Sequence, residues 1–398
     1  MHKYAFLLVF LLATGLTSKA QDIVLSGEAE ISVVVADPGT VELFEVFGHP
    51  AIRVFDPVNK IDAAFNYGVF DFNQPNFYLN FTKGYLNYML AVWRYPSFEA
   101  AYISENRSLV EYVLNLSQKQ KQEIFDFLVN NVKPENRNYF YDYFYDNCAT
   151  RIWDVFDITL KDDLHFDPGY VETGHSFRTL VDSLTANKPW GDFGIDLCLG
   201  LPMDKKLTAY EYMFLPEFLG RGIAKATIDR EGETQPFVKE KRLIYQSDPK
   251  EINAGLFTPK LLFWSIFILT LVMSAIAFFK GKYFRFFDIL LFGVIGIAGL
   301  LLLILWVATN HSAAANNLNI IWANPLYLIG VFFLLKSKKP DWLSWFFLTN
   351  LVVMILFLIF WPLNPQGINI AVIPVILTLG IRSWYIFYRL RMDQKIKN

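Results

Sequence analysis

Cys148 stands in a setting that favours a reactive thiol. It follows Asp146 and Asn147, either of which is suited to N-cap a helix whose apolar face begins at Ile152. The thiol then lies in the first helical turn, where the helix dipole and the backbone N–H groups stabilise a thiolate. The same N–H groups can serve as an oxyanion hole for a tetrahedral intermediate. The alternative is a small buried thiol at the start of a helix.

A thiolate nucleophile needs a base, and His49 is the histidine best placed to supply one. It opens the apolar strand predicted at Pro50–Phe55. In the neighbouring strand, we expect Asn66 to orient the imidazole, with Tyr67 and Asp71 as the alternatives. These residues predict a Cys/His/Asn constellation for nucleophilic catalysis.

Polar residues around these motifs are candidates for binding the substrate. For His175, the alternative is a capping role before a helix at 177–184, and for Cys198 we expect a buried position or a disulfide to Cys148. No spacing resembles a zinc site, a phosphate loop or a dinucleotide fingerprint, so we expect neither metal nor cofactor. The substrate-binding candidates are Asn147, Arg53, Tyr67, His175 and Arg178.

The composition divides the chain into two parts. Hydrophobic residues make up 54% of the 398 residues and charged residues only 19%, which is unusual for a soluble domain. Residues 261–398 carry 11 Lys and Arg against 3 Asp and Glu, whereas residues 21–260 carry 23 against 35. This balance excludes a nucleic-acid binder driven by a basic surface, a disordered chain and a disulfide-dense small domain.

The chain is expected to have three segments. Residues 1–20 resemble a signal peptide, with a basic start, an apolar stretch and a small-x-small pattern at Ser18–Ala20; an uncleaved anchor is the alternative. Residues 21–258 mix strand patterns with a helix opened by a capping box at Ser117–Gln120, which predicts an α+β domain. Residues 259–398 are expected to form a helical membrane domain.

Five apolar runs in the last segment each approach the ~20 residues that a helix needs to cross a bilayer. Lys and Arg follow the first, third and fifth runs, whereas the connections after the second and fourth contain neither. By the positive-inside rule, the N-terminal domain lies outside and the C-terminus is cytoplasmic. The runs are Leu261–Phe279, Phe286–Val307, Ile320–Leu335, Trp342–Leu363 and Ile368–Phe387.

Two polar residues within these runs need an explanation. Asn350, near the middle of the fourth run, is expected to bridge helices, with a cavity-lining role as the alternative. Arg382, near the inner end of the fifth run, is expected to extend to the cytoplasmic interface.

Several segments carry a resemblance to a known family. A His at the start of a hairpin strand, followed about a hundred residues later by Asn-Cys at the head of a helix, resembles the circularly permuted papain-like proteins, which include relatives of the NlpC hydrolases. More narrowly, most of residues 25–220 resembles the Lnb-type lipoprotein N-acyltransferases of bacteria. The matching segments are Phe47–Val54, Phe65–Phe72, Tyr145–Ile152, Ser176–Asp182, Phe193–Leu197 and Met213–Pro216.

The resemblance implies a papain-like α+β periplasmic domain and acyl transfer at the outer face of the bacterial inner membrane. A phospholipid would be the acyl donor, and the α-amine of a diacylated lipoprotein would be the acceptor. Cys148 would form a thioester and His49 would act as the base. The alternatives are a membrane-anchored Cys/His hydrolase, acting on cell-wall peptide or phospholipid, and a non-enzymatic assembly factor.

Overall fold

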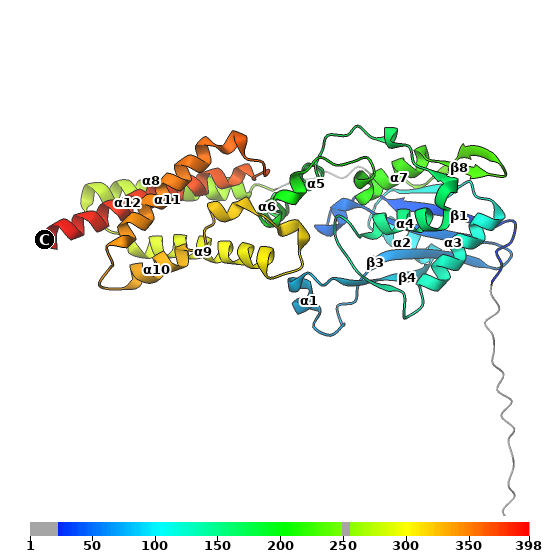
Figure 1. Cartoon of the computed structure of the whole chain (residues 1–398), viewed down its shortest axis with the longest axis horizontal. Coiled ribbons are helices and arrows are strands. Elements are labelled where there is room, and N and C mark those ends of the chain that lie inside the picture. The colour runs from blue at the N-terminus through cyan, green and yellow to red at the C-terminus, as the bar shows by residue number, and fades with distance from the viewer. Residues whose placement is uncertain (1–22, 249–254, 398) are drawn as a thin grey trace, which may run out of the picture.

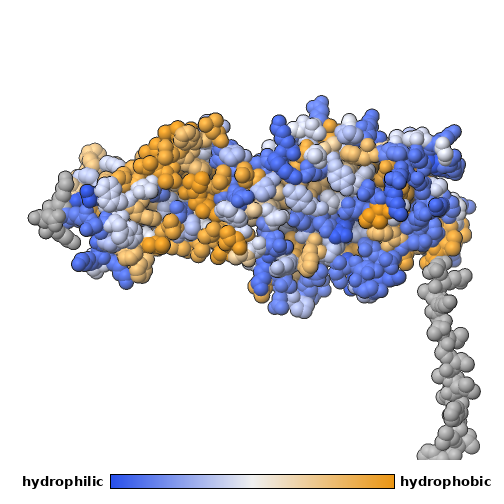
Figure 2. Space-filling view, viewed as in Figure 1, coloured by the Kyte–Doolittle hydropathy of each residue, from blue (hydrophilic) through white to orange (hydrophobic). Residues whose placement is uncertain are grey.

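The computed structural model describes residues 23–248 and 255–397, and it has two parts placed end to end (Figure 1). A sheet-rich domain is followed by a bundle of long helices, with the C-terminus at the far end of the bundle. Apolar side chains gather over the helices, and polar ones over the sheet domain (Figure 2). The α+β domain and the helical membrane domain predicted from the sequence are both confirmed, whereas the expected signal peptide, residues 1–20, lies outside the described residues.

The described part of the N-terminal domain is built on a seven-stranded antiparallel sheet with the order β10-β5-β1-β2-β3-β4-β6. The predicted hairpin is confirmed as β2 and β3, which pair through Ile52 and Phe65. The strands are β1 (Glu30–Ala36), β2 (His49–Asp56), β3 (Ile61–Val69), β4 (Asn87–Arg94), β5 (Leu109–Leu114), β6 (Asn138–Phe140) and β10 (Val238–Tyr245).

Helices cover both faces of this sheet because alternate strand residues point to opposite sides. Val33 and Val35 of β1 belong to the larger core, under α3, α4 and α7, whereas Val34 packs on the other face with Phe98 of α2. The remaining elements are a small sheet, made of β7, β8 and β9, and peripheral helices. The helices of this domain and the strands of its small sheet are α1 (Phe77–Lys83), α2 (Tyr95–Ser104), α3 (Gln118–Asn131), α4 (Cys148–Leu160), α5 (Phe177–Thr185), α6 (Pro189–Cys198), α7 (Pro216–Lys225), β7 (Leu164–His165), β8 (Thr227–Arg230) and β9 (Glu233–Pro236).

Local sequence signals set two of these boundaries. Ser117 and Gln120 form the predicted capping box, in which each side chain accepts a hydrogen bond from the other residue's backbone N–H. In the aromatic string at residues 139–145, only Tyr139 and Phe140 belong to a strand, the short β6. Asp142 ends it, because its carboxylate accepts the N–H groups of Phe144 and Tyr145 and makes a turn.

Four helices in the described residues are long and apolar enough to cross a membrane. They are α8 (Pro259–Lys280), α9 (Arg285–Val307), α11 (Trp342–Ile359) and α12 (Ile373–Lys397).

The third predicted span is different. Its helix, α10 (Tyr327–Leu335), has nine residues and rises only ~14 Å, about half the thickness of the hydrocarbon layer. Asn324 and Pro325 precede the helix, and the Asn324 side chain accepts the N–H of Leu326 instead of allowing the helix to extend backward.

The polar residues inside the bundle pair with one another. Asn350 accepts a hydrogen bond from the Tyr327 hydroxyl at 2.5 Å and donates to Ser383 at 2.6 Å, so it bridges α10, α11 and α12 as expected. The expectation for Arg382 is wrong. Its guanidinium is fully buried and makes two hydrogen bonds to Asp288 of α9, at 2.6 and 2.9 Å, because an unpaired charge at this depth would be costly.

Polar contacts join the sheet domain to the outer ends of the membrane helices. The Gly200 N–H donates to the carbonyl of Ala313 at 2.7 Å, and the Asn317 side chain donates to the carbonyl of Leu197 at 2.8 Å. A Cβ on Gly200 would lie 1.8 Å from the carbonyl oxygen of Ala315, so the two backbones touch here. These contacts therefore fix the position of the sheet domain relative to the ends of the membrane helices.

Candidate active site

Cys148 is the first residue of α4, and Asn147 is its N-cap. The Asn147 side chain accepts the N–H groups of Ala149 and Thr150 at 2.8 and 3.0 Å, and it donates to the carbonyls of Tyr143 and Phe214. All four bonds fix the start of the helix, so Asn147 positions the thiol by holding the turn that carries it.

His49 opens β2, and its Nε2 lies 2.6 Å from Oδ1 of Asn66 on β3. Because that oxygen can only accept, the bond assigns the proton to Nε2 and leaves Nδ1 as the basic nitrogen. The structure thus brings together His49, named as the base, and Asn66, named as the orienting residue. The Asn66 side chain is buried, with 3% of the residue exposed.

Gly68 lies close to both Cys148 and His49. A Cβ built on it would be 3.3 Å from Cβ of Cys148 and 4.0 Å from Cε1 of His49. Its φ of +85° favours glycine, and the β3–β4 register shifts between Asn66 and Val69. The irregular strand lets Cys148 and His49 approach the same point from a helix and a strand.

Two tyrosines complete the surroundings of this pair. Tyr141 lies beside Cys148, since a Cβ on Gly68 would be 3.4 Å from Cε2 of Tyr141 and 3.3 Å from Cβ of Cys148. Tyr102 of α2 stacks on the His49 ring, with centroids 6.3 Å apart and planes inclined by 15°. Burial raises the pKa of Tyr141 well above its usual value, so its hydroxyl stays a donor.

Burial controls the charges of the two central groups. It raises the pKa of the Cys148 thiol to about 12, although hydrogen bonds from Tyr141 and Ala149 oppose the change. It lowers the pKa of His49 to about 4, and the positive charge of Arg107 adds to this effect. The expected stabilised thiolate is therefore wrong for the resting protein, because loss of water outweighs the helix terminus.

Two of the predicted substrate-binding residues have partners within the sheet domain. Arg53 donates to Asp62 at 2.8 and 3.1 Å and to Glu111 at 3.1 Å. Tyr67 is buried, and its hydroxyl donates to Asn131 of α3 at 2.7 Å. These contacts link strands and helices, and the structure does not bring either polar group to the thiol.

Two further candidates, His175 and Arg178, lie at the start of α5. His175 is exposed, and its ring lies edge-on to Tyr212. Arg178 is only 2% exposed, and its guanidinium nitrogens donate to the carboxylates of Asp196 and Asp204 and to nearby carbonyls. Arg178 therefore lies at a junction where its guanidinium already has partners. Asp204 also accepts the N–H of Gly367, in the membrane part, at 2.8 Å.

The two cysteines do not pair. Both are free in the structure, and Cys198 at the end of α6 is exposed, which contradicts the buried position expected for it. The thiol at the helix start is the buried one.

Sequence reasoning missed Gly68, Tyr141 and Tyr102. Gly68 stands two residues after Asn66, and a glycine inside a strand pattern is a signal for a bulge or a close backbone approach. The tyrosines gave no such signal, because the chain contains 20 of them and ring contacts depend on tertiary packing.

Comparison with known protein families covers most of the chain. Residues 29–182 match the model of the Lnb N-terminal periplasmic domain, and residues 251–393 match that of the Lnb transmembrane domain. No curated protein and no solved structure was found to match. With a periplasmic domain that carries Cys148 and His49 and a transmembrane domain behind it, the chain belongs to the Lnb family.

Proposed function

We propose that this protein is a lipoprotein N-acyltransferase that works through a thioester on Cys148. The observation that carries the proposal is the convergence of Cys148 and His49 on Gly68 in a domain fixed to the outer ends of membrane helices. Family membership supports a role in lipoprotein processing. The substrates follow from the resemblance to lipoprotein N-acyltransferases: a phospholipid as donor and the α-amine of a diacylglyceryl-cysteine as acceptor.

In the first half-reaction, His49 takes the proton from the thiol as sulfur attacks the ester carbonyl of the phospholipid. The tetrahedral intermediate collapses when the C–O bond to the glycerol breaks. The leaving alkoxide takes the proton from His49, so a lysophospholipid departs and the acyl group remains on sulfur.

In the second half-reaction, the neutral α-amine of the lipoprotein attacks the thioester. His49 accepts a proton from the amine, and the C–S bond breaks to give an amide. The departing sulfur recovers that proton from His49, so the thiol and the neutral imidazole are restored. Asn66 keeps the ring in one tautomer through both steps.

Charge on the carbonyl oxygen must be stabilised in both intermediates. The cap already takes the N–H groups of Ala149 and Thr150, so we propose the N–H of Cys148 and the hydroxyl of Tyr141 as the oxyanion donors. A papain-like arrangement is part of this proposal, since the Cys heads a helix packed on an antiparallel sheet whose strand β2 begins with the His.

The proposed topology puts this chemistry at the outer face of the inner membrane. Lys and Arg cluster after Phe279, after Leu335 and after Tyr388, which favours a cytoplasmic location for those ends and for the C-terminus. A cleaved signal peptide at residues 1–20 fits an exported sheet domain.

The direct test uses the full chain in proteoliposomes with phospholipid and a diacylated lipopeptide. We expect a lipopeptide heavier by one amide-linked acyl chain, and an acyl adduct on the enzyme in the absence of acceptor. Cys148→Ala and His49→Ala should lower the rate at least ~10³-fold, because nucleophile and base act as a unit. Cys198→Ala, which removes the other free thiol, is the matched control. Release of fatty acid without an N-acylated product would instead indicate a hydrolase.

A further inference from the structure

The segment at residues 71–86, here called the α1 loop, exposes large apolar side chains next to the sheet. Phe72, Tyr78 and Leu79 are 60%, 73% and 52% exposed, and Phe81 and Tyr85 are also exposed. The segment contains only two charged residues, Asp71 and Lys83. An apolar patch of this kind on a folded domain indicates a contact surface.

The α1 loop lies at the level where the membrane helices end. The N–H of Asn310 donates to the carbonyl of Lys83 at 2.8 Å, and a Cβ on Gly84 would lie 2.8 Å from the carbonyl carbon of Asn310. Asn310 follows the outer end of α9 at Val307, and Figure 1 shows α1 beside that end. The apolar patch is thus continuous with the outer end of the transmembrane bundle.

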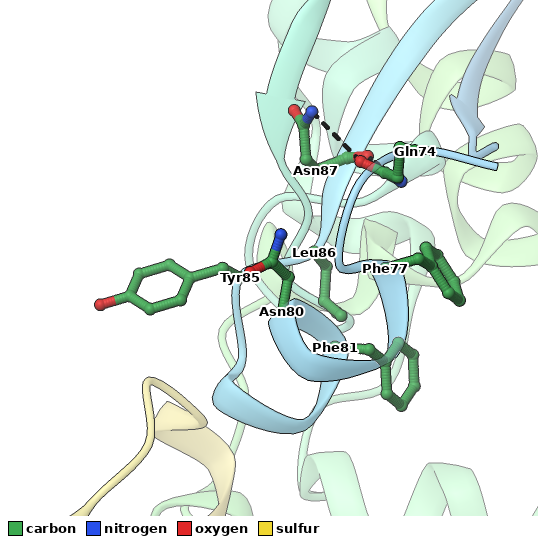
Figure 3. A pocket seen from close by; sticks show the side chains of 7 residues that line it. All are labelled: Gln74, Phe77, Asn80, Phe81, Tyr85, Leu86 and Asn87. Atoms are coloured by element: carbon green, nitrogen blue, oxygen red, sulfur yellow. Dashed lines mark hydrogen bonds between the residues drawn. The ribbon is translucent and has the colours of Figure 1, made fainter. Parts of the chain in front are cut away.

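The large side chains of the α1 loop point in different directions (Figure 3). Phe77 and Phe81 of α1 lie on one side of the helix, whereas Tyr85, which follows the helix, points away from them. Gln74 and Asn87 close the loop through a hydrogen bond of 3.4 Å between their side chains. Rings with one polar edge, mixed with neutral amides, are typical of side chains at the headgroup level of a bilayer.

A row of aromatic rings leads from this loop to the thiol. The Phe72 and Phe70 centroids are 4.9 Å apart, Phe70 and Tyr88 are 4.9 Å apart, and Tyr88 and Tyr141 are 4.6 Å apart. Tyr141 in turn lies beside Cys148, since both residues come within 3.4 Å of the Cβ position of Gly68. Phe72 is 60% exposed and Tyr88 is 7% exposed, and Tyr141 at the end of the row is half-buried, so the row leads from the exposed loop to the site of the thiol.

We propose that the α1 loop inserts into the headgroup layer of the outer leaflet, and that an acyl chain of the donor phospholipid passes along these rings to Cys148. The second half of this inference rests on the proposed function. The occupant of the patch is the lipid bilayer, because the Lys83–Asn310 contact sets the loop at the membrane surface. Membrane contact by the loop explains how a buried thiol reaches an ester that never leaves the leaflet.

The test is the depth of a fluorescent label in lipid. Tyr78→Cys, in a chain with Cys148→Ser and Cys198→Ser, is labelled with a nitrobenzoxadiazole and placed in nanodiscs. We expect a blue-shifted emission and at least about twofold more quenching by lipids with a nitroxide near the headgroup than for the control label. The control is Val58→Cys. Val58 is 62% exposed and lies in the β2–β3 turn, where the side chain of the next residue, Asn59, donates to the carbonyl of Val24.

Two results would overturn the inference. One is equal, water-like emission from both labels; the other is a blue shift at position 78 without quenching by lipid, which would place a protein partner or a second copy on the patch. In the unlabelled enzyme, Leu79→Ser should raise the apparent KM for phospholipid, expressed as mole fraction, about 10-fold, whereas Val58→Ser should not. An unchanged KM in Leu79→Ser would contradict the acyl route. Because the label reports lipid contact without any reaction, the two ideas fail separately. Quenching of the label, together with no acyl-enzyme in the unlabelled chain that keeps Cys148, would reject the proposed function and keep the membrane contact.

Discussion

Gly68 and Cys148 are packed so closely that a Cβ on the glycine would lie 3.3 Å from Cβ of the cysteine. The same added atom would meet Tyr141 at 3.4 Å, and the backbone at φ +85° would resist any L side chain. The nucleophile therefore depends on a residue that has no side chain and takes no part in the chemistry.

Gly68→Ala should lower the rate of acyl-enzyme formation about 10-fold, because the neighbours of the added methyl group must move by a few tenths of an ångström and a displacement of about 1 Å costs about 10²-fold. The strained backbone should cost about 1–3 kcal/mol of stability. Intact-mass kinetics and thermal unfolding separate the two effects. Gly27→Ala is the control, since nothing lies within 4 Å of its added Cβ. Equal rates for the two variants would show that the close approach is irrelevant.

Asn66→Ala should lower kcat by about 10-fold or more, since the imidazole loses the bond at 2.6 Å that fixes its tautomer. Asn66→Asp should restore the orientation, and its negative charge should raise the pKa of His49. The acid limb of the pH profile would then move toward neutral pH, which a purely structural role of Asn66 does not predict. Steady-state rates at several pH values provide the measurement.

Tyr141→Phe should slow the acylation of Cys148 about 10²-fold if the hydroxyl stabilises the oxyanion. The ring contacts with Tyr88 and the fold should be preserved, because only one oxygen atom is removed. Tyr143→Phe on the neighbouring exposed position is the matched control. A Tyr141→Phe enzyme with a normal rate would leave the N–H of Cys148 as the oxyanion donor.

The parts of the site that the sequence could predict are those with local signals. Asn147 before Cys148 is a cap signal, and His49 before an apolar run marks a strand start, so both elements were placed correctly. The thiol's pKa could not be predicted, because it depends on how much water the surrounding rings exclude. The residue type and its place at the start of a helix favoured a thiolate, whereas burial raises the pKa of Cys148 and favours the neutral thiol.

In the membrane part, too, local patterns could be predicted from the sequence and long-range contacts could not. Hydropathy located the five apolar runs, but it could not show that the third contains only the nine-residue helix α10, since the interruption at Asn324 and Pro325 depends on local backbone contacts. The buried pair of Arg382 and Asp288 joins residues 94 positions apart, so neither charge alone revealed its partner. Long-range contacts of this kind need the fold before they can be recognised.

Arg178 was a candidate for substrate binding, and its contacts lead to a different prediction. Arg178→Ala leaves the carboxylates of Asp196 and Asp204 without the positive charge that they share, which should cost about 3–5 kcal/mol of stability. Thermal unfolding in detergent measures this loss. At a temperature where the variant remains folded, KM for the lipopeptide should stay within about twofold of wild type. A raised KM without loss of stability would restore the binding role.

The resting charges of Cys148 and His49 give the last prediction. With the thiol pKa at about 12, alkylation of Cys148 by iodoacetamide should be slow at pH 7 and should rise with pH through pH 9, because only the thiolate reacts. With the His49 pKa at about 4, the imidazole is neutral and able to accept a proton throughout pH 5–9. The acylation rate should therefore be flat over that range and fall as the pH drops through about 4, where His49 becomes protonated. Arg107→Gln removes a positive charge that lowers the pKa of His49, so the fall should begin at higher pH in that variant. A thiolate–imidazolium pair in the resting enzyme would instead give rapid alkylation at pH 6, with an inflection near pH 4, and that result would show that the site is hydrated before the donor binds.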